Sequence, residues 1–412
     1  MMKRKVLAKI IIKIIARYTD VDEKDINVNS IISDELGLFS LDFVTVIADI
    51  ENILHIRIED WDATVNIKTI QELIDVVELN LSRKYKIQAS SMFVESRQNC
   101  PQNRFGKKGL NWIIELFIAG IMLFLSAMLI RFITFGILAL KLYFDRGVSY
   151  NGFIKSYTEQ LSINPSEWNN YTTVIGLYSM VIGIIIICMY VKYIQHRSTS
   201  SIGLKKVKLG KEIIWGMISG FGSITVVVLL SAFAGGINIT FSENVNCFSI
   251  LLYFGGWCIQ GLFEEVFCRG YFATSIYRRY SLPTTIFLSS LAFAFCHLMN
   301  TGITILGTVN IFLYGVLCIL YMIKRDSIWG VATFHATWNF VQGNIYGLSV
   351  SGNSENWSVL NFVNTETANQ LINGGTFGIE GSIFMTIIMI FGIAVIYYLV
   401  PNVSEDSIVK GE

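Results

Sequence analysis

The sequence predicts an all-α fold, a polytopic membrane bundle of about eight transmembrane helices preceded by a soluble four-helix domain. Composition is the first observation: 53% of the 412 residues are hydrophobic and only 15% are charged, whereas soluble proteins carry about 25% charged residues. The second is that apolar runs of the roughly 20 residues that a bilayer requires begin only after residue 110. The third is that the part before them is polar and acidic.

The first part of the chain, residues 1–85, is predicted to be a soluble helical domain. From Tyr18 to Asn80 it holds fifteen acidic and three basic residues, a local net charge of −12. Apolar residues recur at helical spacing over the segments 1–17, 40–54 and 70–81. Residues 86–110 lack such periodicity and are rich in Gln, Asn, Ser and charge, so we expect a linker there.

Residues 111–402 are predicted to form a membrane domain, and residues 403–412 a cytoplasmic tail. Eight apolar spans lie at about 112–143, 172–194, 213–237, 248–272, 283–299, 302–323, 327–347 and 379–400. If the N-terminal domain is cytoplasmic, the inner loops carry nine Lys and Arg residues and the outer loops carry two. This bias follows the positive-inside rule and predicts a multi-pass protein with both termini in the cytoplasm.

Ionisable side chains inside these spans are candidates for function, because burying charge in a membrane is costly. The fourth span carries Glu264, Glu265 and Arg269. Glu265 and Arg269 are four residues apart on one helix face and can form an ion pair. Glu264 lies about 100° further round the helix, so we expect it to remain unpaired and to act as a general base.

The fifth and seventh spans contribute two histidines and an amide. His335 and Asn339 are four residues apart, so both side chains can point to one spot. Pro283 suits the first turn of the fifth span, and folding the fourth and fifth spans back at that turn brings His297 level with the glutamates. Two carboxylates, two imidazoles and a carboxamide can activate water and stabilise an oxyanion. Hydrogen bonding between helices is the alternative interpretation.

These residues fall into three motifs that follow one another along the chain, namely EExxxR at 264–269, FxxxH at 293–297 and HxxxN at 335–339. Over about residues 110–400 the sequence resembles the CAAX-protease and bacteriocin-processing (CPBP, or Abi) family of intramembrane endopeptidases. The resemblance implies hydrolysis of a peptide bond in a membrane-associated peptide or in a lipidated protein.

The resemblance also implies roles for the individual residues. Glu264 with His297 would activate water, and His335 with Asn339 would hold the oxyanion. Arg269 would orient the two glutamates. The family has also been described as metal-dependent, and Glu and His side chains can bind zinc. We prefer a glutamate base, because Asn is a poor zinc ligand.

A second resemblance surrounds Ser40, which lies in the run LGLFSLD at 36–42. A serine before an amphipathic helix can be a simple N-cap. The acidic four-helix pattern and the LGxxSLD run, however, resemble an acyl carrier protein, in which this serine carries 4′-phosphopantetheine. The resemblance implies a phosphopantetheinyl transferase and an acyl- or aminoacyl-loading enzyme as partners. Phe39 replaces the Asp that usually precedes the serine in that family.

Three functions remain open on the sequence alone. The first is an intramembrane protease whose substrate is delivered by the carrier domain or coupled to it. The second is an acyltransferase that uses a carrier-bound thioester, with an amine in place of water. The third is a non-enzymatic bacteriocin-immunity or scaffold protein. In all three cases we expect membrane lipid to be a partner of the protein. A net charge of +1 gives no reason to expect nucleic acid as a partner. Usage rich in Ile and Asn suits a bacterial cytoplasmic membrane.

Overall fold

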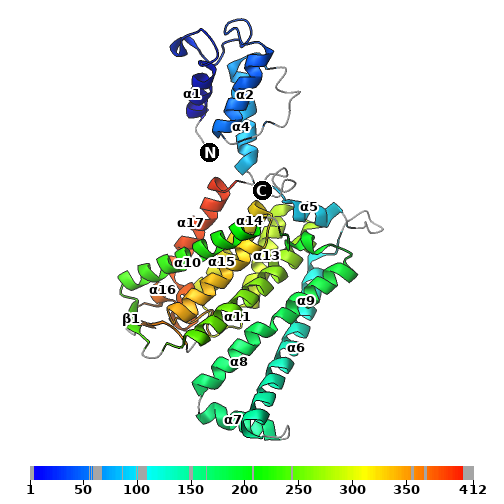
Figure 1. Ribbon diagram of the computed structural model, residues 1–412, viewed down its shortest axis with the longest axis vertical. Coiled ribbons are helices and arrows are strands. Elements are labelled where there is room, and N and C mark those ends of the chain that lie inside the picture. The colour runs from blue at the N-terminus through cyan, green and yellow to red at the C-terminus, as the bar shows by residue number, and fades with distance from the viewer. Residues whose placement is uncertain are drawn as a thin grey trace. The chain divides into compact units, whose positions relative to one another are not determined.

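The computed structural model describes most of the chain and confirms the all-α class (Figure 1). The described residues are 4–54, 56, 58, 67–85, 87–98, 100, 109–147, 152–163, 165–206, 208–242, 245–353, 357–365 and 369–401. Contacts divide the chain into two compact units, the first built mainly from residues 1–87 and the second mainly from residues 88–396.

The first unit is a helical domain around an aliphatic core. The helices among its described residues are α1 (Arg4–Ile15), the short η1 (Glu23–Asp25), α2 (Ser40–Leu54) and α4 (Ile70–Tyr85). Each long helix turns one apolar stripe inward, which is the pattern that the helical spacing predicts. The core includes Ile11 of α1, Ile47 of α2 and Leu73 of α4, all at most 1% exposed. This burial supplies the main driving force for folding of the domain.

The second unit begins with a helix inside the segment that we expect to be a linker. This helix, α5 (Ser91–Gln98), buries Met92 and Phe93 completely. The side chain of Arg97 donates hydrogen bonds to the backbone oxygens of Tyr277 and Tyr280, at the end of the helix that carries the glutamates. The connection between α4 and α5 is therefore residues 86–90.

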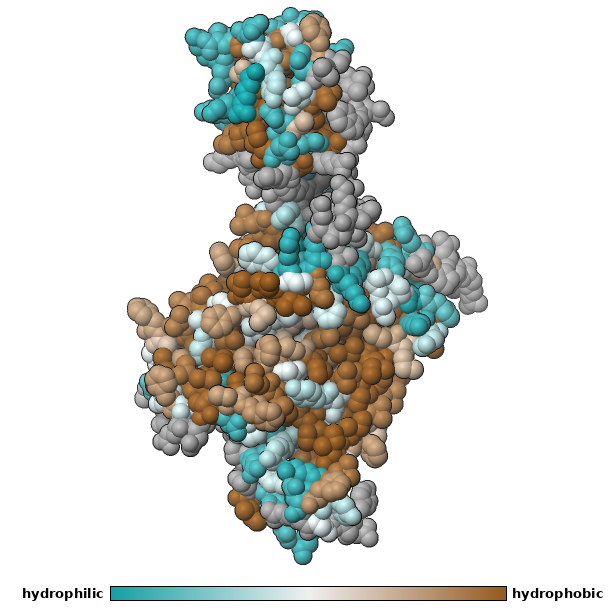
Figure 2. Space-filling view, viewed as in Figure 1, coloured by the Kyte–Doolittle hydropathy of each residue, from teal (hydrophilic) through white to brown (hydrophobic). Residues whose placement is uncertain are grey.

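Within the described part of the second unit, five helical segments are long and apolar enough to cross a membrane. Three of them are the single helices α6 (Trp112–Arg146), α10 (Leu209–Phe233) and α14 (Ile305–Arg325). The fourth consists of α8 (Pro165–Ser179), α9 (Val181–Met189) and η3 (Tyr190–Ile194), and the fifth of α11 (Cys247–Glu265), η5 (Val266–Ala273) and α12 (Thr274–Tyr277). Large apolar side chains cover much of the face of this unit that Figure 2 shows. Such a surface suits contact with lipid.

The predicted count of eight spans is not confirmed. The fifth and eighth predicted spans correspond to α13 (Leu282–Cys296) and α17 (Ile383–Leu399), which are apolar but shorter. The seventh corresponds to α15 (Trp329–Phe340), followed by the π-helical turn η6 (Val341–Ile345). Most residues of α15 are buried inside the unit, so this helix meets protein rather than lipid.

The remaining elements connect these helices. They are α7 (Phe153–Ile163), η4 (Thr199–Ile202), α16 (Gln370–Asn373), η7 (Gly375–Phe377), η8 (Ile379–Gly381) and the strands β1 (Ile237–Phe241) and β2 (Leu360–Asn364). The two strands pair antiparallel, with Ile239 opposite Phe362. This pairing ties the loop after α10 to the segment that precedes α17.

Glycines allow α15 to pack closely between α10 and α11. A Cβ added at Gly261 of α11 would lie only 2.8 Å from the backbone nitrogen of Ala336. A Cβ at Gly220 of α10 would lie 2.6 Å from the backbone oxygen of Phe334. Small residues at such crossings let helix backbones approach one another in a membrane. The close approach brings the polar residues of α11 and α15 within reach of each other.

Candidate active site

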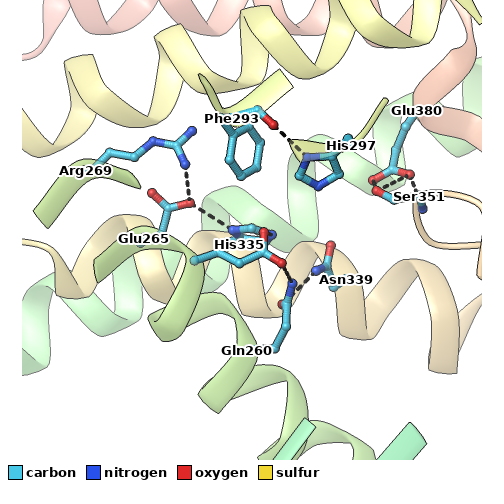
Figure 3. Close-up of polar contacts among 10 residues, drawn as sticks. Gln260, Glu265, Arg269, Phe293, His297, His335, Asn339, Ser351 and Glu380 are labelled. Atoms are coloured by element: carbon cyan, nitrogen blue, oxygen red, sulfur yellow. Dashed lines mark hydrogen bonds and ion pairs between the residues drawn. The ribbon is translucent and has the colours of Figure 1, made fainter. Parts of the chain in front are cut away.

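Three segments bring the predicted membrane-site residues together (Figure 3). Glu264 and Glu265 are the last residues of α11, and the helix continues as η5, a π-helical stretch that contains Arg269. His297 directly follows α13, and α15 carries His335 and Asn339. π-Helical stretches are rare and are often found at functional sites.

Glu265 is the centre of a buried charge network. Its Oε1 atom accepts a hydrogen bond from Nη1 of Arg269 at 3.1 Å and lies 2.9 Å from Nδ1 of His335. The side chains of Glu265 and Arg269 are fully buried. Because a carboxylate only accepts hydrogen bonds, Nδ1 of His335 carries its proton toward Glu265. This contact fixes the imidazole so that Nε2 faces the other glutamate.

Glu264 is held differently from its neighbour. Its Oε1 atom accepts a hydrogen bond from Gln260 at 2.5 Å, and Gln260 in turn accepts one from Asn339 at 3.0 Å. Its Oε2 atom is buried and makes no hydrogen bond within the described residues. That atom lies 3.8 Å from Nε2 of His335. Glu264 therefore offers one oxygen that is not engaged, as we expect for a general base.

His297 approaches the same site from α13. Its Nδ1 atom lies 2.8 Å from the backbone oxygen of Phe293. Because a carbonyl oxygen only accepts hydrogen bonds, Nδ1 must be the protonated nitrogen, and Nε2 of the neutral ring is left as an acceptor. The guanidinium of Arg269 also lies over the Phe293 ring, with Cζ of Arg269 4.1 Å from the ring centroid. The FxxxH motif thus contacts the EExxxR motif through Phe293.

A cavity of about 100 Å³ opens between these helices. It is lined by Gln260, Glu264, His297, His335 and Asn339, together with the aromatic rings of Trp257, Phe293, Tyr314 and Trp338 and with residues from the loops before α17. Its volume has room for several water molecules. Glu265 and Arg269 are not among the lining residues, which suits a positioning role.

The cavity also contains residues that the motifs do not indicate. Glu380 of η8 lines it with a side chain that is only 4% exposed. Ser351, in a tight turn after η6, lines it as well and donates hydrogen bonds to Glu380. Glu380 lies at the start of the eighth predicted span, so the cost of a buried carboxylate in a membrane was a signal that could have found it.

The zinc alternative finds no support in the donor geometry. Within the described residues, no group of three or more His, Cys, Asp and Glu side chains is arranged to hold a metal ion.

The predicted attachment residue of the first unit is placed only by its backbone. Ser40 is the first residue of α2, and its side chain lies outside the described part of the structure. The neighbouring Phe39 is 70% exposed, so the start of α2 lies at the surface of its unit. A surface position at a helix start suits a serine that an enzyme must reach.

Comparison with known families gives two matches. Residues 246–341 match the family described as Type II CAAX prenyl endopeptidase Rce1-like. Residues 9–77 match the family described as phosphopantetheine attachment site. Both resemblances noted in the sequence are thereby confirmed. No curated protein and no solved structure matches the chain.

The two matched regions contain the site residues that the sequence predicts. The Rce1-like segment includes all three motifs, and the carrier-type segment includes Ser40. A phosphopantetheine attachment domain implies 4′-phosphopantetheine as a prosthetic group and an enzyme that attaches it. Glu380 and Ser351 lie outside the Rce1-like match, although they line the same cavity as Glu264.

Proposed function

We propose that this protein is an intramembrane endopeptidase that hydrolyses a peptide bond of a membrane-associated peptide or a lipidated protein. One observation carries the proposal. The buried Oε2 of Glu264 has no hydrogen-bond partner among the described residues and lies in a cavity with two imidazoles and an amide. A buried carboxylate oxygen without a partner costs free energy, and its retention is explained if it binds a reacting water.

Water activation uses Glu264 and His297. Oε2 of Glu264 and Nε2 of His297 are both acceptors, so each can take one hydrogen of the same water molecule. The water oxygen then attacks the substrate carbonyl carbon, and its proton passes to the carboxylate of Glu264. Gln260 holds the other carboxylate oxygen and keeps the base oriented.

Oxyanion stabilisation uses His335 and Asn339. Glu265 fixes the Nδ1 proton of His335, and in the imidazolium form Nε2 donates a second hydrogen bond toward the cavity. The Nδ2 group of Asn339 has two hydrogens, and only one is used by Gln260. Donors fixed in advance stabilise the charge that develops on the carbonyl oxygen. The C–N bond then breaks, and Glu264 returns its proton to the leaving amine.

The carrier domain would act through Ser40. We assign the attachment of 4′-phosphopantetheine to this residue because it begins α2 at the surface of a unit that matches the attachment-site family. When bound, the group supplies a flexible arm that ends in a thiol. The short connection at 86–90 would hold the domain at high effective concentration near the membrane enzyme. A phosphopantetheinyl transferase and an acyl- or aminoacyl-loading enzyme are its expected partners.

We place the protein in a bacterial cytoplasmic membrane with both termini in the cytoplasm. The excess of Lys and Arg in the loops on one side supports this orientation. It also puts the carrier domain in the compartment where carrier-modifying enzymes act.

Cleavage of a lipid-anchored peptide library by the full chain in liposomes tests the proposed function. One arm contains prenylated peptides that end in a CAAX sequence. The wild type should release new carboxyl and amino termini, detected by mass spectrometry, and Glu264→Gln should lower the rate about 10²- to 10⁴-fold. Glu115→Gln is the matched control, because Glu115 is a fully buried glutamate of α6 outside the cavity lining.

The same experiment separates hydrolysis from its alternatives. Transfer of a peptidyl or acyl group to an added amine, with no free acid formed, would favour an acyltransferase. Equal product formation by the wild type and by Glu264→Gln would contradict both enzymatic functions.

A further inference from the structure

Glu380 is a second carboxylate in the cavity and is contributed by a segment outside the matched family region. It lies in η8, just before α17, and is 4% exposed. Its Oε2 atom accepts a hydrogen bond from the backbone nitrogen of Ser351 at 2.5 Å, and its Oε1 atom accepts one from the hydroxyl of Ser351 at 3.1 Å. In Figure 3, Glu380 and Ser351 lie beyond His297, on the side away from Glu265 and Arg269.

The charges that line the cavity are unbalanced. Two carboxylates, Glu264 and Glu380, and two imidazoles line it, and the lining includes no Lys or Arg from the described residues. When His335 is the imidazolium of the proposed mechanism, its charge offsets one carboxylate and leaves the other without a counter-charge in the lining. Arg269, the nearby buried cation, is paired with Glu265 and lies outside the lining. A cavity with low-dielectric walls and excess negative charge attracts a positive group, because the walls focus the field of its charges.

The Glu380 carboxylate also retains capacity to bind. A carboxylate offers about four lone-pair sites, and the hydrogen bonds from the backbone and hydroxyl of Ser351 and from the side chain of Gln342 use three of them. The neighbouring lining residues Asn300 and Asn353 add amide oxygens, and Ser351 adds a hydroxyl. A substrate ammonium or guanidinium could therefore replace water at this end of the cavity with charge-assisted hydrogen bonds, which are among the stronger ones.

We propose that Glu380 is a specificity-determining residue that binds a positively charged side chain of the substrate, Lys or Arg, close to the scissile bond. The proposal rests on the endopeptidase function proposed above and names the substrate class of that site. It implies that substrates carry a basic residue at one fixed position relative to the bond that is cleaved.

A purely structural role for Glu380 predicts a different behaviour. Ser351 has a φ of 47° and precedes Gly352, whose φ is 85°. Together they form a tight turn closed by hydrogen bonds between Val350 and Asn353. If Glu380 only supported this turn, its loss would lower the rate for all substrates equally. Binding of a cation would instead change the preference among substrates.

The experiment compares lipid-anchored peptides that differ only by Lys or norleucine, a residue of similar length without charge, at each position around the scissile bond. The full chain in liposomes cleaves each pair in competition, and the ratio of kcat/KM values is measured. We expect the wild type to favour Lys about tenfold at one position. Glu380→Gln should bring this ratio close to one, mainly through KM, whereas Glu380→Asp should keep part of the preference.

Controls separate this proposal from folding and from the proposed function. Glu115→Gln should keep the wild-type Lys preference, and thermal unfolding in detergent shows whether Glu380→Gln is folded. Binding of the same peptide pairs to the Glu264→Gln chain, measured by fluorescence anisotropy, needs no turnover. A Lys preference in binding that is lost with Glu380→Gln would support the cation site even if no peptide were cleaved.

Two results would overturn the proposal. The first is equal binding and cleavage of Lys and norleucine peptides by the wild type at every position. The second is an undiminished Lys preference in folded Glu380→Gln. Absence of cleavage together with a Glu380-dependent Lys preference in binding would count against the endopeptidase function alone.

Discussion

Nδ1 of His335 donates a hydrogen bond to Oε1 of Glu265, with the two atoms 2.9 Å apart, and this bond joins α15 to α11 inside the membrane unit. The same carboxylate oxygen accepts the hydrogen bond from Arg269. Glu265 therefore connects a cation, which offsets its buried charge, to an imidazole that faces the cavity. The two adjacent glutamates therefore have different roles, with Glu265 positioning His335 and Glu264 facing the cavity.

The adjacent glutamates should respond differently to the same substitution. Glu265→Gln removes the partner charge of the buried Arg269, and breaking a buried ion pair costs about 3–5 kcal/mol of stability. Glu264 contacts no Arg or Lys among the described residues, and its nearest charged partner is the imidazole of His335 at 3.8 Å, so Glu264→Gln should lower the stability of the chain less than Glu265→Gln does, while it lowers turnover about 10²- to 10⁴-fold. Thermal unfolding in detergent, measured beside peptide cleavage, checks both expectations. Equal stability of the two variants would contradict this division of roles.

Close packing at Gly261 should be required for activity. An added Cβ would meet backbone atoms of α15 at 2.8 and 2.9 Å, so Gly261→Ala should push that helix away and move His335 from the glutamates. Overpacking of this kind typically costs about 1–3 kcal/mol, and we expect both stability and turnover to fall. Gly222→Ala is the matched control, because a Cβ at Gly222 of α10 meets nothing within 4 Å.

Much of this site could be predicted from sequence, because its geometry depends on helix periodicity. A spacing of four residues places Glu265 and Arg269 on one face, as the ion pair at 3.1 Å shows. The same spacing places His335 and Asn339 toward one cavity. The placement of His297 follows from an antiparallel turn between neighbouring helices, which also needs only local information.

Other features depend on contacts between distant segments and could not be predicted in the same way. Glu380 reaches the cavity through hydrogen bonds to Ser351, and no spacing rule relates these two residues. The count of eight spans relied on hydropathy, which does not distinguish a lipid-facing helix from α15, a helix buried among its neighbours. The docking of α5 depends on hydrogen bonds to backbone oxygens such as that of Tyr277. Every residue type has a backbone oxygen, so the sequence does not indicate which one is bound.

Turnover should be insensitive to removal of metal ions. Glu264 and His297 supply the base without a metal in the proposed mechanism, and within the described residues no group of metal-ligating side chains is arranged to hold an ion. The rate of peptide cleavage after dialysis against EDTA should equal the untreated rate. Loss of turnover with EDTA that is restored by added zinc would instead support the metal-dependent mechanism.

Modification of the carrier domain should depend on Ser40 and be limited by the residue before it. Intact-mass measurement of the full chain, incubated with a phosphopantetheinyl transferase and coenzyme A, should show one added phosphopantetheine on the wild type and none on Ser40→Ala. Phe39 is 70% exposed and cannot accept a hydrogen bond. Phe39→Asp should raise the rate about tenfold if the carboxylate gains one charge-assisted contact with the transferase, whereas equal rates would exclude that contact.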